Sequence, residues 1–196
     1  MDTRTFHFHT CLGAGGFGEV YRADMTTTGG LTQVVAVKML RSGLAPASQS
    51  VERLRDEGRM LARLQHPVVL GVHDMTVMEG RVALVTEYVE GQDLDACFTG
   101  EAPLPSRALL QVIGQVADAL YSAWEALCLV HRDIKPSNIR LGTHGQVKLL
   151  DFGIARSEQG DREAHTATNM MVGSLPYMAP ERFATADIQP AADVFA

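Results

Sequence analysis

HRDIKPSN, residues 131–138, is the stretch of this sequence that decides the fold. Pro136 and its polar neighbours indicate a loop, and loops at the ends of rigid elements commonly present functional groups. Asp133 can accept a proton from a hydroxyl group, Lys135 can offset charge on a phosphoryl group, and Asn138 can bind a divalent cation through its amide oxygen. A charged surface turn would look the same in isolation, so the interpretation depends on partners elsewhere in the chain.

Composition places the chain among globular proteins. It has 196 residues, of which 46% are hydrophobic and 20% charged, and a formal net charge of −6. The acidic balance argues against nonspecific nucleic-acid binding as the main role. The cysteines at positions 11, 97 and 128 are too few and too widely spaced for a disulfide framework, so we expect a reducing, cytoplasmic environment. No apolar run approaches the ~20 residues of a membrane helix, and we expect any membrane anchor to lie outside this chain.

A glycine-rich segment lies near the N-terminus. Gly13, Gly15 and Gly18 form G-x-G-x-x-G, a pattern that lets a backbone approach phosphate oxygens closely. Dinucleotide-binding turns share this pattern but continue into a helix. Residues 19–23 are rich in β-branched and aromatic side chains and predict a second strand instead. We therefore expect a hairpin loop over phosphates.

The strand before these glycines contains two histidines. Alternation in residues 6–9, FHFH, would place His7 and His9 on one face. Two histidines could contribute to a metal site, but no further ligand stands at a spacing typical of zinc sites. Solvated histidines on a β-strand are the expectation.

A lysine and a glutamate nineteen residues apart are predicted to pair. Residues 34–38, VVAVK, predict a strand with Ala36 and Lys38 on one face. Residues 48–64 predict a helix in which Glu57 falls within a stripe of leucines. A carboxylate in an apolar stripe needs a partner, and Lys38 is the obvious one. The alternative is a glutamate at the edge of the stripe that reaches solvent.

The remaining periodic segments surround the octapeptide. Residues 68–77 and 81–87 predict two strands, and residues 106–127 predict a core helix that leads to the octapeptide. Residues 147–150 predict a strand that ends at Asp151, eighteen residues after the aspartate of the octapeptide. A carboxylate there can bind Mg²⁺ together with an amide oxygen.

These motifs, in this order, resemble those of serine/threonine protein kinases. The octapeptide resembles the catalytic loop, and VAVK resembles the strand that carries the phosphate-binding lysine. DFG at 151–153 and APE at 179–181 resemble the ends of the activation segment. The lysine two positions after the catalytic aspartate resembles the Ser/Thr-specific form, and GSLPYMAPE at 173–181 resembles bacterial, eukaryotic-like (Hanks-type) members.

The resemblance implies an α+β, two-lobed protein-kinase-like fold. Residues 1–87 would form an N-lobe with an antiparallel sheet and one helix, residues 88–91 the hinge, and residues 92–196 a mainly helical, incomplete C-lobe. Members of the family continue with several further helices, so we expect a C-terminally truncated catalytic domain. Apolar surface beneath the C-lobe would then be exposed.

The resemblance also implies ATP, with Mg²⁺ or Mn²⁺, and transfer of the γ-phosphoryl group to a Ser or Thr hydroxyl of a protein substrate. Asp133 would accept the hydroxyl proton and Lys135 would stabilise the transferring group, while Asn138 and Asp151 would hold the metal ion. The ATP-binding residues that the family pattern implies are Leu12, Gly13, Gly15, Gly18, Val20, Ala36, Lys38, Glu57, Glu87, Val89 and Asp93.

The resemblance also implies sites of regulation, and one residue differs from the family pattern. Thr166 and Thr168 resemble activation-loop phosphorylation sites, whose charge Arg132 could pair with; the alternative is two solvated threonines. Dimerisation would allow autophosphorylation between copies. Arg140 stands where the family usually has an apolar residue under the adenine, and we expect it to weaken nucleotide packing.

Two other functions are consistent with parts of the pattern. A small-molecule phosphotransferase would share the fold, but it usually lacks the lysine of the octapeptide and the GSLPYMAPE loop. A non-catalytic nucleotide- or protein-binding fragment would keep the motifs without turnover. Phosphate incorporation that disappears in Asp133→Asn would exclude this second alternative.

Overall fold

The computed structural model describes residues 4–15, 18–41, 48–99, 103–152, 175–183 and 189–196. The chain forms two compact units. Unit 1 comprises Met1–Ala62 and Gly71–Tyr88, and unit 2 comprises Arg63–Leu70 and Val89–Ala196. Residues 63–70, which the sequence places in the first lobe, thus group with the second unit.

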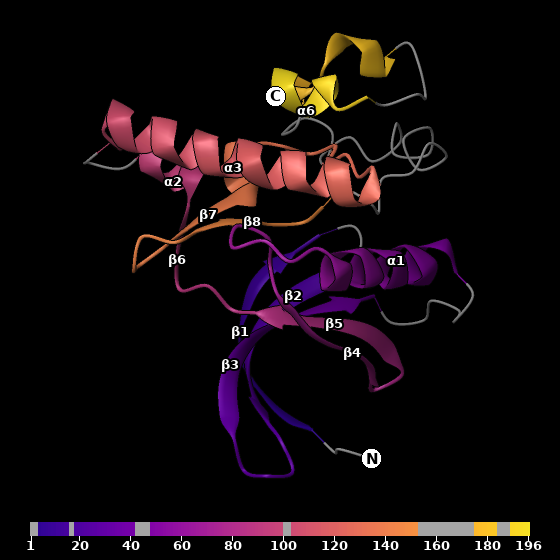
Figure 1. Ribbon diagram of the computed structural model, residues 1–196. Coiled ribbons are helices and arrows are strands. Elements are labelled where there is room, and N and C mark those ends of the chain that lie inside the picture. The colour runs from indigo at the N-terminus through magenta and orange to yellow at the C-terminus, as the bar shows by residue number, and fades with distance from the viewer. Residues whose placement is uncertain (1–3, 16–17, 42–47, 100–102, 153–174, 184–188) are drawn as a thin grey trace. The chain divides into compact units, whose positions relative to one another are not determined.

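Unit 1 contains a five-stranded antiparallel sheet with the order β1-β2-β3-β5-β4 (Figure 1). The first part of β4 differs from the prediction, since the strand starts at Val72 and not at residue 68. Val68 does not join this sheet because its carbonyl accepts the Leu149 N–H, 2.7 Å away, within unit 2. The strands and the accompanying helix are β1 (Thr5–Ala14), β2 (Gly18–Thr26), β3 (Thr32–Leu40), β4 (Val72–Met78), β5 (Arg81–Glu87) and α1 (Gln49–Arg63).

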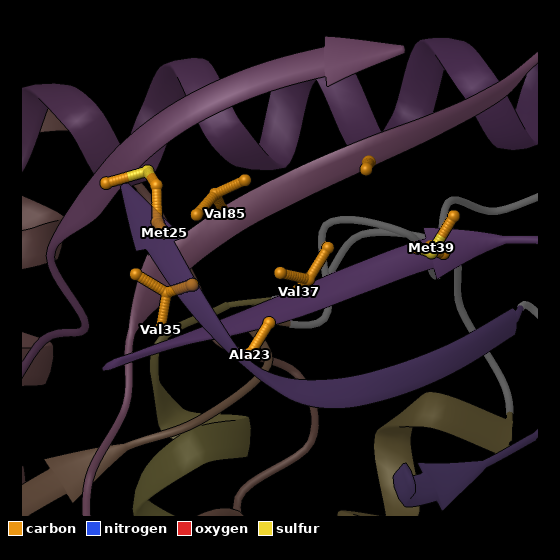
Figure 2. Packing of buried hydrophobic residues seen from close by; sticks show 7 residues of the cluster. Ala23, Met25, Val35, Val37, Met39 and Val85 are labelled. Carbon is orange, nitrogen blue, oxygen red and sulfur yellow. The ribbon is translucent and has the colours of Figure 1, made fainter. Parts of the chain in front are cut away.

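Alternating side chains build the core of this sheet (Figure 2). Val35 and Val37 of β3 and Val85 of β5 are fully buried, and each such side chain contributes about 1.5–3 kcal/mol as an upper estimate. Ala23 and Met25 of β2 pack into the same cluster. The partly exposed residues between them therefore belong to the opposite face, as the period of two predicts.

Helix α1 buries the predicted stripe. Leu54, Glu57 and Leu61 are all at most 5% exposed. Gly58 lies in the same buried face, and a Cβ there would overlap the side-chain ends of Met75 and Leu84. The glycine therefore allows α1 to approach β4 and β5 closely, which offsets the ~1 kcal/mol that it costs a helix.

Unit 2 combines helices with a small antiparallel sheet of order β6-β7-β8. The long helix has the predicted ends, but β6 and β7 were not predicted because strands of three or four residues are too short to show a period. The elements are β6 (Gly91–Asp93), α2 (Leu94–Thr99), α3 (Ser106–Leu127), η1 (Pro136–Asn138), β7 (Ile139–Gly142), β8 (Val147–Leu149), η4 (Leu175–Tyr177), η5 (Pro180–Phe183) and α6 (Ala191–Phe195).

Helix α3 presents two different apolar faces. Val112, Val116 and Ala119 are buried. Ile113, on the helix that was predicted to be a core helix, is 51% exposed. It lines an apolar groove of about 680 Å³ that extends to Phe195 of α6. The exposed side chains of Phe98, Tyr121 and Val194 line the same groove.

No helix in the described part of the chain is both long and apolar enough to cross a membrane.

Candidate active site

Unit 1 brings the predicted lysine and glutamate together. Lys38 Nζ lies 3.1 Å from Glu57 Oε1 and 3.2 Å from Oε2. Glu57 is 2% exposed, whereas the side chain of Lys38 is 24% exposed. The buried carboxylate thus holds an ammonium group that still reaches solvent, which confirms the pairing inferred from the leucine stripe. Val20 of β2 is the cross-strand partner of Lys38.

The glycine-rich segment forms the predicted hairpin between β1 and β2. Gly15 N–H donates to the Gly18 carbonyl at 2.8 Å and closes the turn, and Gly13 pairs with Val20 across the strands. A Cβ at Gly18 would overlap the Met39 carbonyl, so only glycine allows β2 to run this close to β3. Leu12 precedes the turn and is 46% exposed. Residues 16 and 17 lie outside the described residues.

The β3–β5 ladder positions the next predicted ATP-binding residues. Ala36 pairs with Thr86, next to Glu87 at the end of β5. The Glu87 N–H donates to the Gly71 carbonyl at 2.9 Å, and the Glu87 carboxylate accepts the Gly71 N–H at 2.6 Å. The Glu87 carbonyl is within 3.3 Å of the Thr86 hydroxyl.

Arg140 and Asp93 form a pair that the sequence did not predict. They are register partners on β7 and β6, and Arg140 Nη1 donates to Asp93 Oδ1 at 2.9 Å. Arg140 Nε donates to the Val89 carbonyl at 3.1 Å. The side chain of Arg140 therefore engages two of the residues implied in ATP binding. Cross-strand pairing explains how an arginine is accommodated here.

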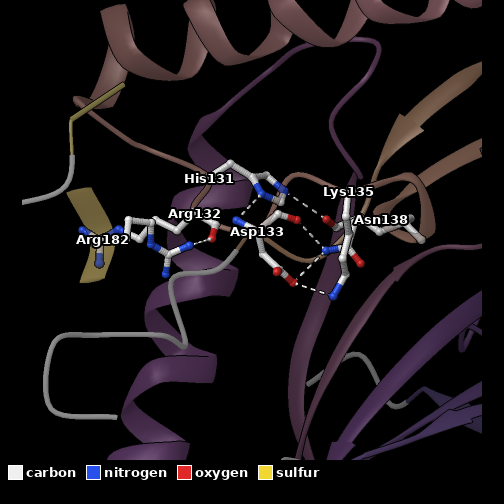
Figure 3. A network of polar contacts seen from close by, with 7 residues as sticks. His131, Arg132, Asp133, Lys135, Asn138 and Arg182 are labelled. Carbon is white, nitrogen blue, oxygen red and sulfur yellow. Dashed lines mark hydrogen bonds and ion pairs between the residues drawn. The ribbon is translucent and has the colours of Figure 1, made fainter. Parts of the chain in front are cut away.

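The octapeptide concentrates its polar side chains around Asp133 (Figure 3). Asn138 Nδ2 donates to the Asp133 carbonyl at 2.7 Å and to its carboxylate at 2.9 Å. Lys135 Nζ lies 3.0 Å from the same carboxylate oxygen, Oδ2. The Asp133 and Lys135 side chains are 11% and 18% exposed. The carboxylate is thus held in one orientation by an amide and an ammonium group, yet it remains accessible.

His131 is a fully buried support for this loop. The Asp133 N–H donates to His131 Nδ1 at 3.3 Å, so Nε2 carries the proton and donates to the Leu150 carbonyl at 3.1 Å. Its ring also packs against Phe152, with centroids 4.6 Å apart. Burial lowers the pKa of His131 despite the opposing effect of Asp193. A neutral imidazole therefore joins the loop to the end of β8.

The backbone of Arg132 is held in an unfavourable conformation. Its φ of 71° lies in the left-handed region, which costs a non-glycine residue about 1–3 kcal/mol. Asp193 accepts the His131 N–H at 2.6 Å and the Arg132 N–H at 2.8 Å. Arg182 Nη1 donates to the Arg132 carbonyl at 2.6 Å. Two side chains distant in sequence thus fix the peptide groups that precede Asp133.

Asp151, the second predicted metal ligand, directly follows Leu150, which is hydrogen-bonded to Asn138. The Leu150 N–H donates to the Asn138 carbonyl at 2.8 Å, and Asp151 adopts a φ of 46°, a region that aspartate tolerates better than most residues. A carboxylate and an amide oxygen from adjoining segments are the hard ligands that Mg²⁺ prefers. The donor set therefore fits the implied metal ion. Gly153 and the predicted phosphorylation sites Thr166 and Thr168 lie outside the described residues.

Comparison with known proteins identifies the family. Residues 6–196 match the family model described as protein kinase domain. The chain belongs to the protein kinase family. It is 38% identical over 195 residues to the serine/threonine-protein kinase PknA of Mycobacterium tuberculosis, and 36% identical over 191 residues to PknH of Mycobacterium bovis. Both alignments cover 97% of this chain, but they cover only 44% of PknA and 31% of PknH.

A solved structure supports the kinase fold. The crystal structure of a mutant form of the PknI kinase domain of Mycobacterium tuberculosis aligns with a TM-score of 0.68 at 31% identity. The alignment covers 96% of this chain and 68% of that chain. The predicted class is confirmed: a two-lobed protein-kinase-like fold with an antiparallel-sheet N-lobe and a mainly helical C-lobe.

Three residues of this kinase site escaped the sequence analysis as site residues. Asp193 and Arg182 hold the backbone of the octapeptide, and His131 joins it to the end of β8. The run DVF at 193–195 resembles the start of a supporting helix in the family, which was the available signal for Asp193. No spacing rule points to Arg182, because its partner is a backbone carbonyl fifty residues away.

Proposed function

We propose that the protein transfers the γ-phosphoryl group of ATP to Ser or Thr hydroxyls of proteins. The observation that carries this proposal is the arrangement around Asp133, where Lys135 and Asn138 hold the carboxylate and leave it accessible. A fixed carboxylate of this kind can orient a hydroxyl group and accept its proton. PknA and PknH, to which the chain is similar, are serine/threonine-protein kinases, which supports the same reaction.

The chain's own residues would divide the work. Lys38, held by Glu57, would position the nucleotide phosphates, and the glycine hairpin would offer backbone N–H groups to them. Lys135 would stabilise charge on the transferring group in the transition state. Asp133 would take the proton of the attacking hydroxyl. No covalent enzyme intermediate is required, because positioning and electrostatic stabilisation supply the rate enhancement.

Asn138 and Asp151 would hold Mg²⁺. When bound, the ion would neutralise phosphate charge and fix the phosphate geometry. Asn138 contributes in a second way, since its amide nitrogen donates to Asp133, which orients its amide oxygen as the acceptor for a cation. Mn²⁺ prefers the same oxygen ligands.

We also propose the finer assignments that the family pattern implies. The two units would correspond to the kinase lobes, with residues 88–91 as the hinge. Thr166 and Thr168 would be autophosphorylated, in a reaction between two copies of the chain. Phosphopeptide mapping after incubation with Mg-ATP tests this, and phosphate found only at other positions would refute it.

The second candidate, a nucleotide- or protein-binding module without turnover, makes a different prediction. Both candidates predict that Mg-ATP raises the unfolding temperature, because a ligand stabilises the state that binds it. Only the kinase predicts labelled phosphoserine or phosphothreonine in a panel of peptides incubated with γ-labelled ATP. Stabilisation by Mg-ATP without any transfer would favour the binding module. Phosphate transfer to small alcohols but not to peptides would favour a small-molecule phosphotransferase.

A further inference from the structure

Two histidines and an aspartate gather on β1 and β2. The atoms of His7, His9 and Asp24 that could act as metal ligands all lie within 4.8 Å of one another. His9 Nε2 lies 2.9 Å from Asp24 Oδ2, and the two imidazole rings are 4.8 Å apart. Both histidines are exposed and the aspartate is partly exposed, so an ion could reach all three. Within the described ranges, this is the one cluster of three such ligands.

Strand register explains why the cluster forms. His7 is the direct cross-strand partner of Asp24. Ala23 and Met25 on either side of Asp24 pack into the core of unit 1, so Asp24 belongs to the outer face. The register of β1 and β2 shifts around His9. A bulge re-aims a side chain, and here it accompanies the approach of His9 to the same carboxylate.

We propose that His7, His9 and Asp24 bind a divalent ion of the zinc class. Two imidazole nitrogens and one carboxylate oxygen are ligands that Zn²⁺ takes in tetrahedral sites, and a water molecule commonly fills the fourth position. Bonds of about 2.0–2.2 Å place tetrahedral ligand atoms about 3.4 Å apart. His9 Nε2 and Asp24 Oδ2 are 2.9 Å apart and all three ligand atoms lie within 4.8 Å, so rotation of the two exposed imidazole rings can bring them to this spacing.

Two neighbouring side chains are directed to other partners. Arg22, the nearest cation along β2 on this face, has its guanidinium over the ring of Tyr88, 5.5 Å from the centroid. Cys11 is the remaining residue of β1 that could act as a metal ligand, but its cross-strand partner is Tyr21 and not Asp24. The Cys11 thiol donates to the Gly13 carbonyl at 3.4 Å and is not a member of the cluster.

This site is independent of the proposed phosphoryl transfer. His7 stands six residues before Gly13 on β1, which corresponds to about 20 Å at ~3.3 Å per residue. An ion there would bridge β1 and β2 and stabilise unit 1. The metal ion of the transfer reaction would instead use oxygen ligands of unit 2, so either proposal can fail without the other.

Calorimetric titration of the full chain with ZnCl₂ tests the site. Cys11→Ser and Cys128→Ser are introduced first, because both thiols are exposed and free and could bind zinc themselves. We expect one ion per chain, with affinity reduced more than about tenfold by His7→Gln, His9→Gln or Asp24→Asn, a change of at least ~1.4 kcal/mol. His144→Gln, which removes an exposed histidine outside the cluster, should leave the affinity unchanged.

Two further readouts keep the test decisive. Zinc should raise the unfolding temperature of the parent chain and of His144→Gln, and should raise that of Asp24→Asn by less. Cobalt(II) bound to the parent should show a visible spectrum without the intense charge-transfer band of a thiolate ligand. Zinc affinity that survives all three cluster substitutions would overturn the proposal and leave a metal-free His9–Asp24 ion pair. A loss of zinc affinity in His144→Gln as large as in the cluster variants would also overturn it.

Discussion

Asp193→Asn is the substitution that should separate the support of the catalytic loop from its chemistry. The Asp193 carboxylate is 9% exposed and accepts the N–H groups of His131 and Arg132 at 2.6 and 2.8 Å. Asparagine keeps the shape but replaces one oxygen with an NH₂ group, which would face an N–H donor. One charge-assisted hydrogen bond, worth about 1.5–3 kcal/mol, is lost, and the remaining bond becomes a neutral one worth about 1 kcal/mol.

The expected total is a loss of about 2–5 kcal/mol in the free energy of unfolding. Because Asp193 also holds Arg132 at a φ of 71°, that backbone should relax and displace Asp133. We therefore expect kcat to fall more than the KM for ATP rises. Urea unfolding and steady-state transfer rates measure the two effects. Asp118→Asn is the matched control, since Asp118 pairs with His66 but is 72% exposed, and such surface pairs contribute little.

The reasoning would be refuted by an Asp193→Asn variant that unfolds at the same urea concentration as the parent and transfers phosphate at the same rate. An effect on stability alone would mean that the Arg132 backbone keeps its conformation without the carboxylate. That result would place the control of Asp133 with Lys135 and Asn138.

Three further predictions concern other parts of the site. Glu57→Gln removes the charge that holds Lys38 and should destabilise unit 1 by about 1–3 kcal/mol. This is less than the loss of a fully buried pair would cost, because Lys38 is partly exposed. Thermal unfolding measures the effect, and a loss below about 0.5 kcal/mol would contradict the prediction. Burial lowers the pKa of His131, so the stability that the neutral imidazole contributes is complete above about pH 6.5 and is lost as the pH falls toward the folded-state pKa. Urea unfolding between pH 7.5 and 5 should therefore show a free energy of unfolding that falls as the pH falls, and His131→Gln should reduce this dependence. Arg140→Leu should provide an apolar contact with the nucleotide and release Asp93 from its ion pair. The KM for ATP should then fall about fivefold, which corresponds to ~1 kcal/mol. A higher KM would show instead that the arginine itself helps to bind ATP.

Sequence reasoning succeeded where a local pattern demanded a distant partner. The stripe that buries Glu57 required a cation, and VAVK supplied Lys38 on the exposed face of its strand. The structure places the two side chains 3.1 Å apart. The helix at 106–127 was also predictable to the residue, because twenty-two residues display a clear helical period.

The contacts that could not be predicted from the sequence depend on strand register and tertiary packing. Arg140 looked like an obstacle to nucleotide packing, but pairing of β6 with β7 places it beside Asp93. Asp24 stands seventeen positions after His7, a spacing unlike any zinc motif, yet the β1–β2 hairpin makes them neighbours. Neither pairing has a local signature, because the hydrogen bonds that align the strands involve every residue type alike.

The most direct test of the central claim is phosphate transfer by Asp133→Asn. The parent chain and this variant would be incubated with γ-labelled Mg-ATP and Ser/Thr peptides. The account predicts transfer by the parent, a fall of at least about 10²-fold in the variant because a positioned base typically contributes 10²–10⁴, and stabilisation of both proteins by Mg-ATP. Equal transfer by the variant would contradict the assigned role of Asp133. A parent chain that binds Mg-ATP but transfers no phosphate would contradict the proposed function itself.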